Sequence, residues 1–235
     1  MALKARPAKA NRCRLELRVA AIIAALIVGG GFVGGCIAAF EKGIASKSEL
    51  EGKSRESSGL GLLQPTDTWF ELLPEFEKCE HLQIGPLRYA HGRTTDVAIS
   101  DASLVNVARM GSLKYIHLDS ATSITTAGWR SLAKSPRLET ISIDSCTQIT
   151  DVDIEELART ENLKEIYLEG LPRVTDAGIR KLSSASKLIC IILSNMPLLT
   201  SDGMSWLEQR RPPLMLQVRN CPNLPDRKGW VGKDK

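Results

Sequence analysis

The sequence lacks the residue patterns that most catalytic and metal-binding sites require. Its six cysteines include no C-x-x-C pair, and its three histidines do not cluster with them at zinc-ligand spacing. No Ser/His/Asp or Cys/His set falls on one predicted surface, and the Glu51–Ser54 segment lacks the first glycine of a phosphate-binding loop. We therefore expect a protein that is not an enzyme and has no metal or cofactor.

An excess of positive charge is missing outside the N-terminus. The net charge is +4 over 235 residues, but the first 18 residues hold six basic side chains against Glu16 alone. The rest of the chain is close to neutral, so its charge does not favour nucleic acid as a partner.

Charged residues are missing altogether from residues 19–40. As a helix, these 22 residues would span about 33 Å, enough for a bilayer core of about 30 Å. Basic residues precede the stretch and Glu41 follows it. This order predicts a single-pass anchor (19–40), a basic segment (1–18) on the cytoplasmic side and the remaining chain outside the cytoplasm.

The same stretch permits other interpretations. A cleaved signal peptide, a mitochondrial presequence and a lipoprotein processing site at Cys36 all remain open. Small residues four apart share one helix face, which favours self-association of membrane helices; they are Gly30, Gly31, Gly34 and Gly35.

A 25-residue period organises the chain from Leu113 to Pro213. Seven apolar columns recur in register over four units, and such a period indicates a solenoid. The columns are Leu113, Leu138, Leu163, Leu188; Ile116, Ile141, Ile166, Ile191; Leu118, Ile143, Leu168, Leu193; Ala121, Cys146, Leu171, Met196; Ile124, Ile149, Val174, Leu199; Trp129, Ile154, Ile179, Met204; and Leu132, Leu157, Leu182, Leu207.

The residue pattern of each 25-residue unit predicts one short strand followed by one short helix. Residues such as Ile141-Ser-Ile143 alternate apolar and polar, as in a strand with one buried face. A threonine then precedes the second apolar pair, and its hydroxyl suits a helix N-cap. An acid follows that threonine in two units, at Asp151 and Asp176, where it suits the positive end of the helix.

This pattern resembles the leucine-rich repeat family in its cysteine-containing form. The closest stretches are residues 138–154 (LETISIDSCTQITDVDI) and 163–179 (LKEIYLEGLPRVTDAGI), although only Cys146 retains the cysteine of the family pattern. The resemblance implies an α/β fold, a leucine-rich-repeat solenoid with parallel strands on a concave face and helices on a convex face, preceded by the transmembrane helix. It says little about function, because the fold serves as a scaffold for binding.

The regions flanking the repeats complete the predicted organisation. Serine, glycine and mixed charges predict a flexible linker over 41–65. The apolar cluster from Trp69 to Phe76 predicts an N-terminal cap over 66–93. We place the repeat domain at 94–225, with Val97 and Ile99 in the strand of a shortened first unit, a closing strand at Leu214–Val218 and a polar tail at 226–235.

Side chains on the outward side of the predicted strands give the candidate binding surface. Asp119, Asp144 and Glu169 form an acidic row, which favours a partner with a basic surface. Tyrosines lie beside it, and the fourth strand presents isoleucines as an apolar end. Cys190 also falls on this predicted exposed side. The remaining candidates are Tyr115, His117, Tyr167, Ile189 and Ile192.

These observations favour a membrane-anchored module that binds another protein through the concave face. Small mitochondrial repeat proteins are similar to residues 84–182, so an assembly factor for respiratory complexes in the mitochondrial inner membrane is an alternative. A ubiquitin-ligase substrate adaptor is another, although the chain has no F-box-like segment. A spacer without any ligand is the alternative from a different class.

Overall fold

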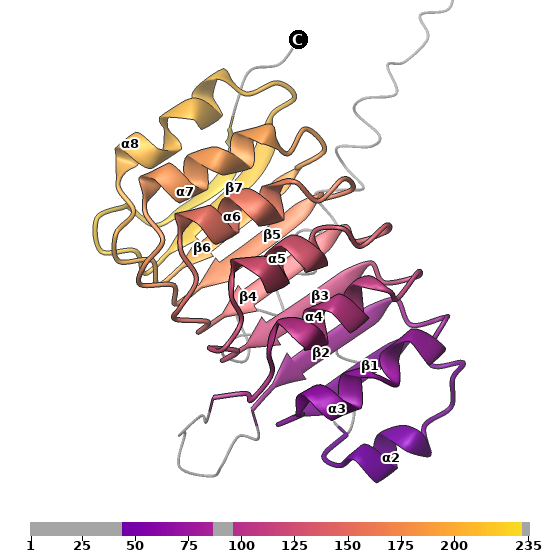
Figure 1. The fold of residues 1–235 in the computed structure, drawn as a ribbon. Coiled ribbons are helices and arrows are strands. Elements are labelled where there is room, and N and C mark those ends of the chain that lie inside the picture. Colours follow the sequence, from indigo (N-terminus) through magenta and orange to yellow (C-terminus); the bar gives the residue numbers. More distant parts are fainter. Residues whose placement is uncertain (1–43, 87–95, 232–235) are drawn as a thin grey trace, which may run out of the picture. The chain divides into compact units, whose positions relative to one another are not determined.

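Seven short parallel strands lie side by side in chain order, and the helices between them cover one face of the resulting sheet (Figure 1). The computed structural model describes residues 44–86 and 96–231. All of these residues belong to one compact unit, residues 43–235. The α/β solenoid arrangement expected from the 25-residue period is present.

The strands and helices alternate along the chain. The strands are β1 (Gly59–Leu63), β2 (His81–Gly85), β3 (Tyr115–Asp119), β4 (Thr140–Asp144), β5 (Glu165–Glu169), β6 (Cys190–Ser194), β7 (Leu214–Arg219) and β8 (Arg227–Val231). The α-helices are α2 (Lys47–Glu51), α3 (Asp67–Phe70), α4 (Asp101–Ala108), α5 (Thr126–Leu132), α6 (Asp151–Ala158), α7 (Asp176–Lys181) and α8 (Ser201–Met204). Short 3-10 helices follow three of them: η2 (Leu73–Glu75), η3 (Leu182–Ser184) and η4 (Ser205–Gln209).

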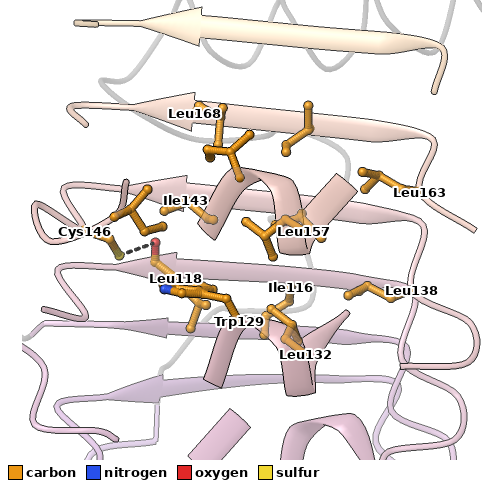
Figure 2. Close-up of a cluster of buried hydrophobic side chains, with 14 of the residues drawn as sticks. Ile116, Leu118, Trp129, Leu132, Leu138, Ile143, Cys146, Leu157, Leu163 and Leu168 are labelled. Carbon is orange, nitrogen blue, oxygen red and sulfur yellow. Dashed lines mark hydrogen bonds between the residues drawn. The ribbon is translucent and has the colours of Figure 1, made fainter. Parts of the chain in front are cut away.

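The predicted apolar columns form the core. Every member is buried, and the most exposed, Met204, keeps 8% of its surface. Neighbouring strands pair in the predicted register, for example Ile116 with Ile141 and Ile141 with Ile166. Figure 2 shows side chains of these columns, among them Trp129, Leu132 and Leu157, stacked between the strands and the helices. The stacked units therefore bury one continuous core.

The family-type cysteine lies in this core. Cys146 is 1% exposed, and its Sγ contacts the carbonyl oxygen of Leu118 at 3.8 Å across the preceding unit (Figure 2). Burial raises the pKa of the Cys146 thiol to about 12. The predicted place of Cys146 in an apolar core column is confirmed.

The predicted first unit is wrong. Val97 and Ile99 are buried but lie outside any strand, and β2 pairs with β3 instead, with Leu82 opposite Ile116. Leu82 and Ile116 are 34 residues apart, nine more than the repeat period, so this unit holds extra residues between its strand and its helix. Ile99 lies one period before Ile124, in the core column that precedes the helix. The prediction failed because Val97 and Ile99 have the two-residue spacing of a strand without forming one.

The predicted linker is also wrong for residues 44–65. Leu50 on α2 and Leu60 and Leu62 on β1 are almost fully buried. Ile44 forms a further parallel bridge to Leu62, with its N–H donating to the Gly61 oxygen at 2.7 Å. The sequence did not predict β1 because two of its five residues are glycines, which are more typical of turns than of strands.

The apolar cluster predicted as a cap is buried as expected. Trp69, Phe70, Leu73 and Phe76 belong to the core. The cluster lies between β1 and β2, however, so it forms the helical half of an early unit and α2 lies nearer the end of the solenoid.

The closing strand is confirmed, whereas the polar tail is wrong for residues 227–231. Leu214, Leu216 and Val218 lie in β7, which continues the parallel sheet. The chain then returns as β8, antiparallel to β7, with Gly229 opposite Leu216. The strand β8 thus covers the backbone edge that β7 would otherwise leave open.

Carboxylates at the starts of the helices join successive units. The two oxygens of Asp151 accept hydrogen bonds from the N–H and the hydroxyl of Thr175, at 2.7 and 2.6 Å. We call this contact the carboxylate clamp. It recurs between Asp67 and Ser100, Asp101 and Thr125, and Asp176 and Thr200.

The clamp explains the glycine three residues after the capping threonine. A Cβ on Gly178 would lie 3.0 Å from the Cα of Asp151 and would clash with its Oδ1. Two units lack this glycine. After Ser100 the position is Ser103, whose hydroxyl donates to the clamping Asp67 at 2.5 Å. In the other unit Thr126 replaces the clamping acid, and Asp153 replaces the glycine. Asp153 accepts from both the N–H and the hydroxyl of Thr150 within its own unit, at 2.8 and 2.9 Å.

The predicted membrane anchor lies outside the described residues, together with the basic segment 1–18 and the four glycines. Across residues 44–86 and 96–231, none of the helices combines the length and the apolar character needed to cross a bilayer.

Candidate protein-binding surface

The side of the sheet opposite the helices is the candidate surface, and we call it the open face. The pairing of β3 to β6 aligns its side chains in the predicted columns. Adjoining strands extend these columns at both ends, through His81, Gln83 and Gly85 on β2 and through Met215, Gln217 and Arg219 on β7. The sequence did not predict the β2 contribution, because the extra residues in that unit broke the period.

Charges just before the strands are already paired with one another. Lys114 contacts Glu80 at 2.6 Å, and Lys164 contacts Glu139 at 2.7 Å. We call these four residues the paired rim. Surface ion pairs of this kind contribute about 0–1 kcal/mol to stability, but they leave this edge of the open face with little net charge.

The opposite edge of the open face is acidic. Asp119, Asp144 and Glu169 lie on three adjacent strands in direct register. We call them the acidic row. Asp119 is 6% exposed, whereas Asp144 and Glu169 are half-buried. Stacked strands are about 4.8 Å apart, a spacing at which like charges repel.

Neighbouring polar groups hold the acidic row in place. Ser120 and Ser145 donate their hydroxyls to Asp119 and Asp144, both at 2.8 Å. The Asn195 amide donates to Glu169 at 2.9 Å. The two serines have positive φ angles of 58° and 53°, so the backbone bends directly after each strand. The carboxylates are therefore fixed in position before any ligand binds.

Ionisation is less favourable than usual at Glu169, the third member of the acidic row. Burial, followed by the negative charge of Asp144, raises the pKa of Glu169 above its usual range, although bonds from Asn195 and Ser194 and the positive charge of Arg219 oppose the shift. A positive group placed against the row would relieve this repulsion.

The predicted aromatic contacts divide into two kinds. Tyr115 is half-buried at the open face, with its ring 6.0 Å from that of His81. Tyr167 is 6% exposed and donates its hydroxyl to Glu165 at 2.7 Å. It therefore offers little surface to a partner. Burial and the Glu165 charge raise the pKa of Tyr167.

Histidine on the open face takes part in a polar pair. His117 Nδ1 lies 2.9 Å from the hydroxyl oxygen of Ser142 on the next strand. This contact fixes the imidazole ring at the centre of the face. In the part of the chain that the structure describes, no three His, Cys, Asp or Glu side chains gather as a metal site.

Two residues that were expected to be exposed on the open face are buried, Ile192 of the apolar end and Cys190. Ile192 is 6% exposed because its partners across the strands, Tyr167 and Gln217, are both large. Cys190, expected on the exposed side of its strand, is 1% exposed between Glu165 and Met215. Ile189 remains half-buried just before β6. The accessible part of the candidate site is therefore the polar stretch from β3 to β5.

Comparison with known proteins adds no assignment to this geometry. No protein-family model matches the chain, and a search of the curated proteins gives no match either.

Proposed function

We propose that this chain is a leucine-rich-repeat protein that binds another protein through its open face and is held at a membrane by residues 19–40. The partner carries a basic surface, which lies along the acidic row. The repeat domain serves as a rigid platform and performs no chemistry. The proposed anchor leaves the basic N-terminal segment in the cytoplasm and the platform outside it.

The register of the acidic row is the observation that carries the proposal. Asp119, Asp144 and Glu169 come from three successive units and point from the same side of the sheet. The serine and asparagine bonds hold them there even though burial and Asp144 raise the pKa of Glu169 and so make its ionisation less favourable than usual. An arrangement that costs stability in the free protein favours a ligand that removes the cost.

The charges at the two edges of the open face support a defined orientation for the partner. The paired rim before the strands has satisfied its own charges through two ion pairs, whereas at the acidic row burial and Asp144 still raise the pKa of Glu169 against the opposing charge of Arg219. A basic partner is therefore attracted to one edge only. Half-buried Tyr115 and His117 lie between the edges and supply contact area with few rotatable bonds.

Capture from solubilised native membranes tests the proposal. The full-length chain is compared with a variant in which Asp119→Asn, Asp144→Asn and Glu169→Gln neutralise the acidic row with little change in shape. We expect a protein that the unchanged chain retains and the variant loses. Binding should also weaken as the salt concentration rises, because salt screens exposed charges.

A matched control removes three carboxylates elsewhere. Glu51, Glu77 and Glu161 are exposed and lie outside the strands, so Glu51→Gln, Glu77→Gln and Glu161→Gln together change the net charge equally. The control should retain the partner. If the neutral acidic row captures the same protein as the unchanged chain, the open-face proposal is wrong.

A further inference from the structure

A basic hollow lies on the helix side of the repeat domain, away from the open face. It occupies about 600 Å³ beside α6 and α7. Its lining includes Glu155, Arg159, Arg180, Lys181, Ser183 and Ser184. We call it the basic hollow. None of these residues contributes to the proposed partner surface.

The hollow arises where one unit departs from the repeat. The equivalent position in earlier units carries a long basic side chain, in Arg109, Lys134 and Arg159, each 25 residues apart. The next position in this series is Ser184. In addition, α7 ends at Lys181 and tightens into the 3-10 helix η3, whereas α6 continues for eight residues. A short side chain thus stands where a long one would fill the space next to Arg159.

The basic groups around the hollow outnumber the acids. The two oxygens of Glu155 contact Arg159 at 3.1 Å and Lys181 at 3.0 Å. Glu156 contacts Arg159 again at 2.8 Å and Arg130 at 2.9 Å. Two carboxylates therefore form ion pairs with three cationic side chains, those of Arg130, Arg159 and Lys181. These contacts hold Arg159 and Lys181 at the hollow.

Arg180 adds a positive charge beyond this network. Its Nη2 donates to the backbone oxygen of Asp202 at 3.3 Å, a weak contact with a neutral group. The C-terminal end of α7 nearby carries only a partial negative charge, of about half an elementary charge or less. A full guanidinium charge exceeds it, so the hollow attracts anions.

Hydroxyl groups complete the lining. Ser184 donates its hydroxyl to the carbonyl oxygen of Lys181 at 2.9 Å. Ser183 is exposed, and its side chain forms no hydrogen bond within the described ranges. Its O–H is thus available as a neutral donor beside the cationic groups. Guanidinium, ammonium and hydroxyl donors around one space suit an anion with several oxygens.

We infer that the basic hollow binds a phosphate-class oxyanion, held by Arg180, Lys181 and Arg159 with the Ser183 hydroxyl. The anion comes either free in solution or as a phosphoryl group on a peptide. The guanidinium of Arg180 is the main contact, because the other two cations already share carboxylates. This site is independent of the proposed partner surface, which attracts charge of the opposite sign.

Titration of the full-length chain in mild detergent tests this inference. Inorganic phosphate and a phosphoserine peptide are added separately, with the unphosphorylated peptide as reference, and backbone amide NMR shifts are followed. We expect saturable shifts around Arg159, Arg180 and Ser183, with half-saturation at about 1 mM or below. Tighter binding of the phosphopeptide identifies a peptide-borne group, whereas equal affinities identify the free anion.

Three variants separate a built site from general attraction. Arg180→Ser should weaken binding about tenfold, since it removes the main charged donor. Ser184→Arg adds a positive charge but restores the long side chain of the repeat, so it should fill the hollow and also weaken binding. Lys134→Ser removes an equivalent exposed charge two units earlier and should leave binding unchanged.

Some results would overturn the inference. An absence of saturable shifts with either ligand would do so. So would tighter binding by Ser184→Arg, or equal weakening by Lys134→Ser and Arg180→Ser, because both would indicate attraction to net charge alone. Amide spectra of the free variants establish that each has kept its fold.

Discussion

At the scale of single residues, Glu169 links the fold to the proposed function. Burial and the neighbouring Asp144 raise its pKa, so the folded protein holds the proton more tightly than the unfolded chain does. Its contribution to stability is therefore fully present below the unfolded pKa and is lost as the pH rises through the folded pKa. At neutral pH the charged form destabilises the free protein.

Glu169→Gln should therefore stabilise the protein at neutral pH. The amide keeps an oxygen for Asn195 and removes the repulsion with Asp144, which is worth about 0.2–1 kcal/mol for a cross-strand pair. The gain should shrink toward zero near pH 4, where the carboxyl group is protonated. Urea unfolding at both pH values measures the difference, with Glu161→Gln as an exposed control. Equal gains at the two pH values would argue against repulsion in the acidic row.

The sequence predicted which side chains share a face, but it did not predict their exposure. Alternation along β6 correctly places Ile192 and Cys190 on the open face. Their burial depends on the size of their partners on β5 and β7, which become neighbours only when the strands pair. Ile192 lies between Tyr167 and Gln217, so its own residue type carries no sign of the cover.

At the scale of elements, the carboxylate clamp explains how one helix positions the next unit. The sequence predicted the capping threonines correctly: Thr175 accepts from the Ala177 N–H at 3.2 Å. The acid that follows was expected to favour its own helix, whereas in the structure Asp151 and Asp176 bind the caps of the following unit. Only the three-dimensional stacking reveals that second partner.

The exceptional unit allows the clamp to be tested by exchange. Asp153→Gly alone leaves the Thr150 N–H and hydroxyl without their acceptor, at a cost of about 1–3 kcal/mol. Thr126→Asp alone places a second carboxylate beside Asp153, whose Oδ1 now accepts from Thr126 at 2.6 Å. Together the two changes recreate the arrangement of Asp151, Thr175 and Gly178.

We therefore expect the double variant to recover most of the stability lost by the single ones. Urea unfolding of all four proteins gives the coupling energy, which should be at least about 1 kcal/mol. Additive losses would show that the clamp does not join neighbouring units.

The sequence did not predict the strands β1, β2 and β8, which lie outside the regular 25-residue period. Cys79 and Leu82 occupy the columns of Leu113 and Ile116 but stand 34 residues before them, so a search at 25 residues misses β2. The strand β1 escaped because Gly59 and Gly61 leave only its buried leucines as a signal. The strand β8 escaped because it runs antiparallel and belongs to no repeat.

At the scale of the whole molecule, a solenoid must close the two ends of its core. Residues 44–63 supply Leu50, Leu60 and Leu62 at one end, and β8 covers the edge of β7 at the other. A folded domain that began at residue 66, as the sequence predicted, would lack residues 44–63 and the cover that they provide. In the structure, residues 44–65 belong to the same compact unit as the repeats.

A truncated chain beginning at residue 66 should be much less stable than one beginning at residue 44. It exposes the apolar side of β2 and loses three buried leucines, which together contribute at least about 3 kcal/mol. Thermal unfolding and binding of a hydrophobic dye distinguish the two chains. Equal melting temperatures would show that residues 44–65 are dispensable for the fold.

The central claim is that the proposed basic partner binds the open face and not the helix side. The most direct measurement places a photo-crosslinking amino acid at either of two positions in the full-length chain within native membranes. One is Tyr115, half-buried on the open face between the paired rim and the acidic row; the other is Val152, 56% exposed on α6. We predict a discrete adduct from position 115 that disappears when the acidic row is neutralised, and none from position 152. An adduct from position 152 alone, or an adduct from position 115 that survives neutralisation, would contradict the account.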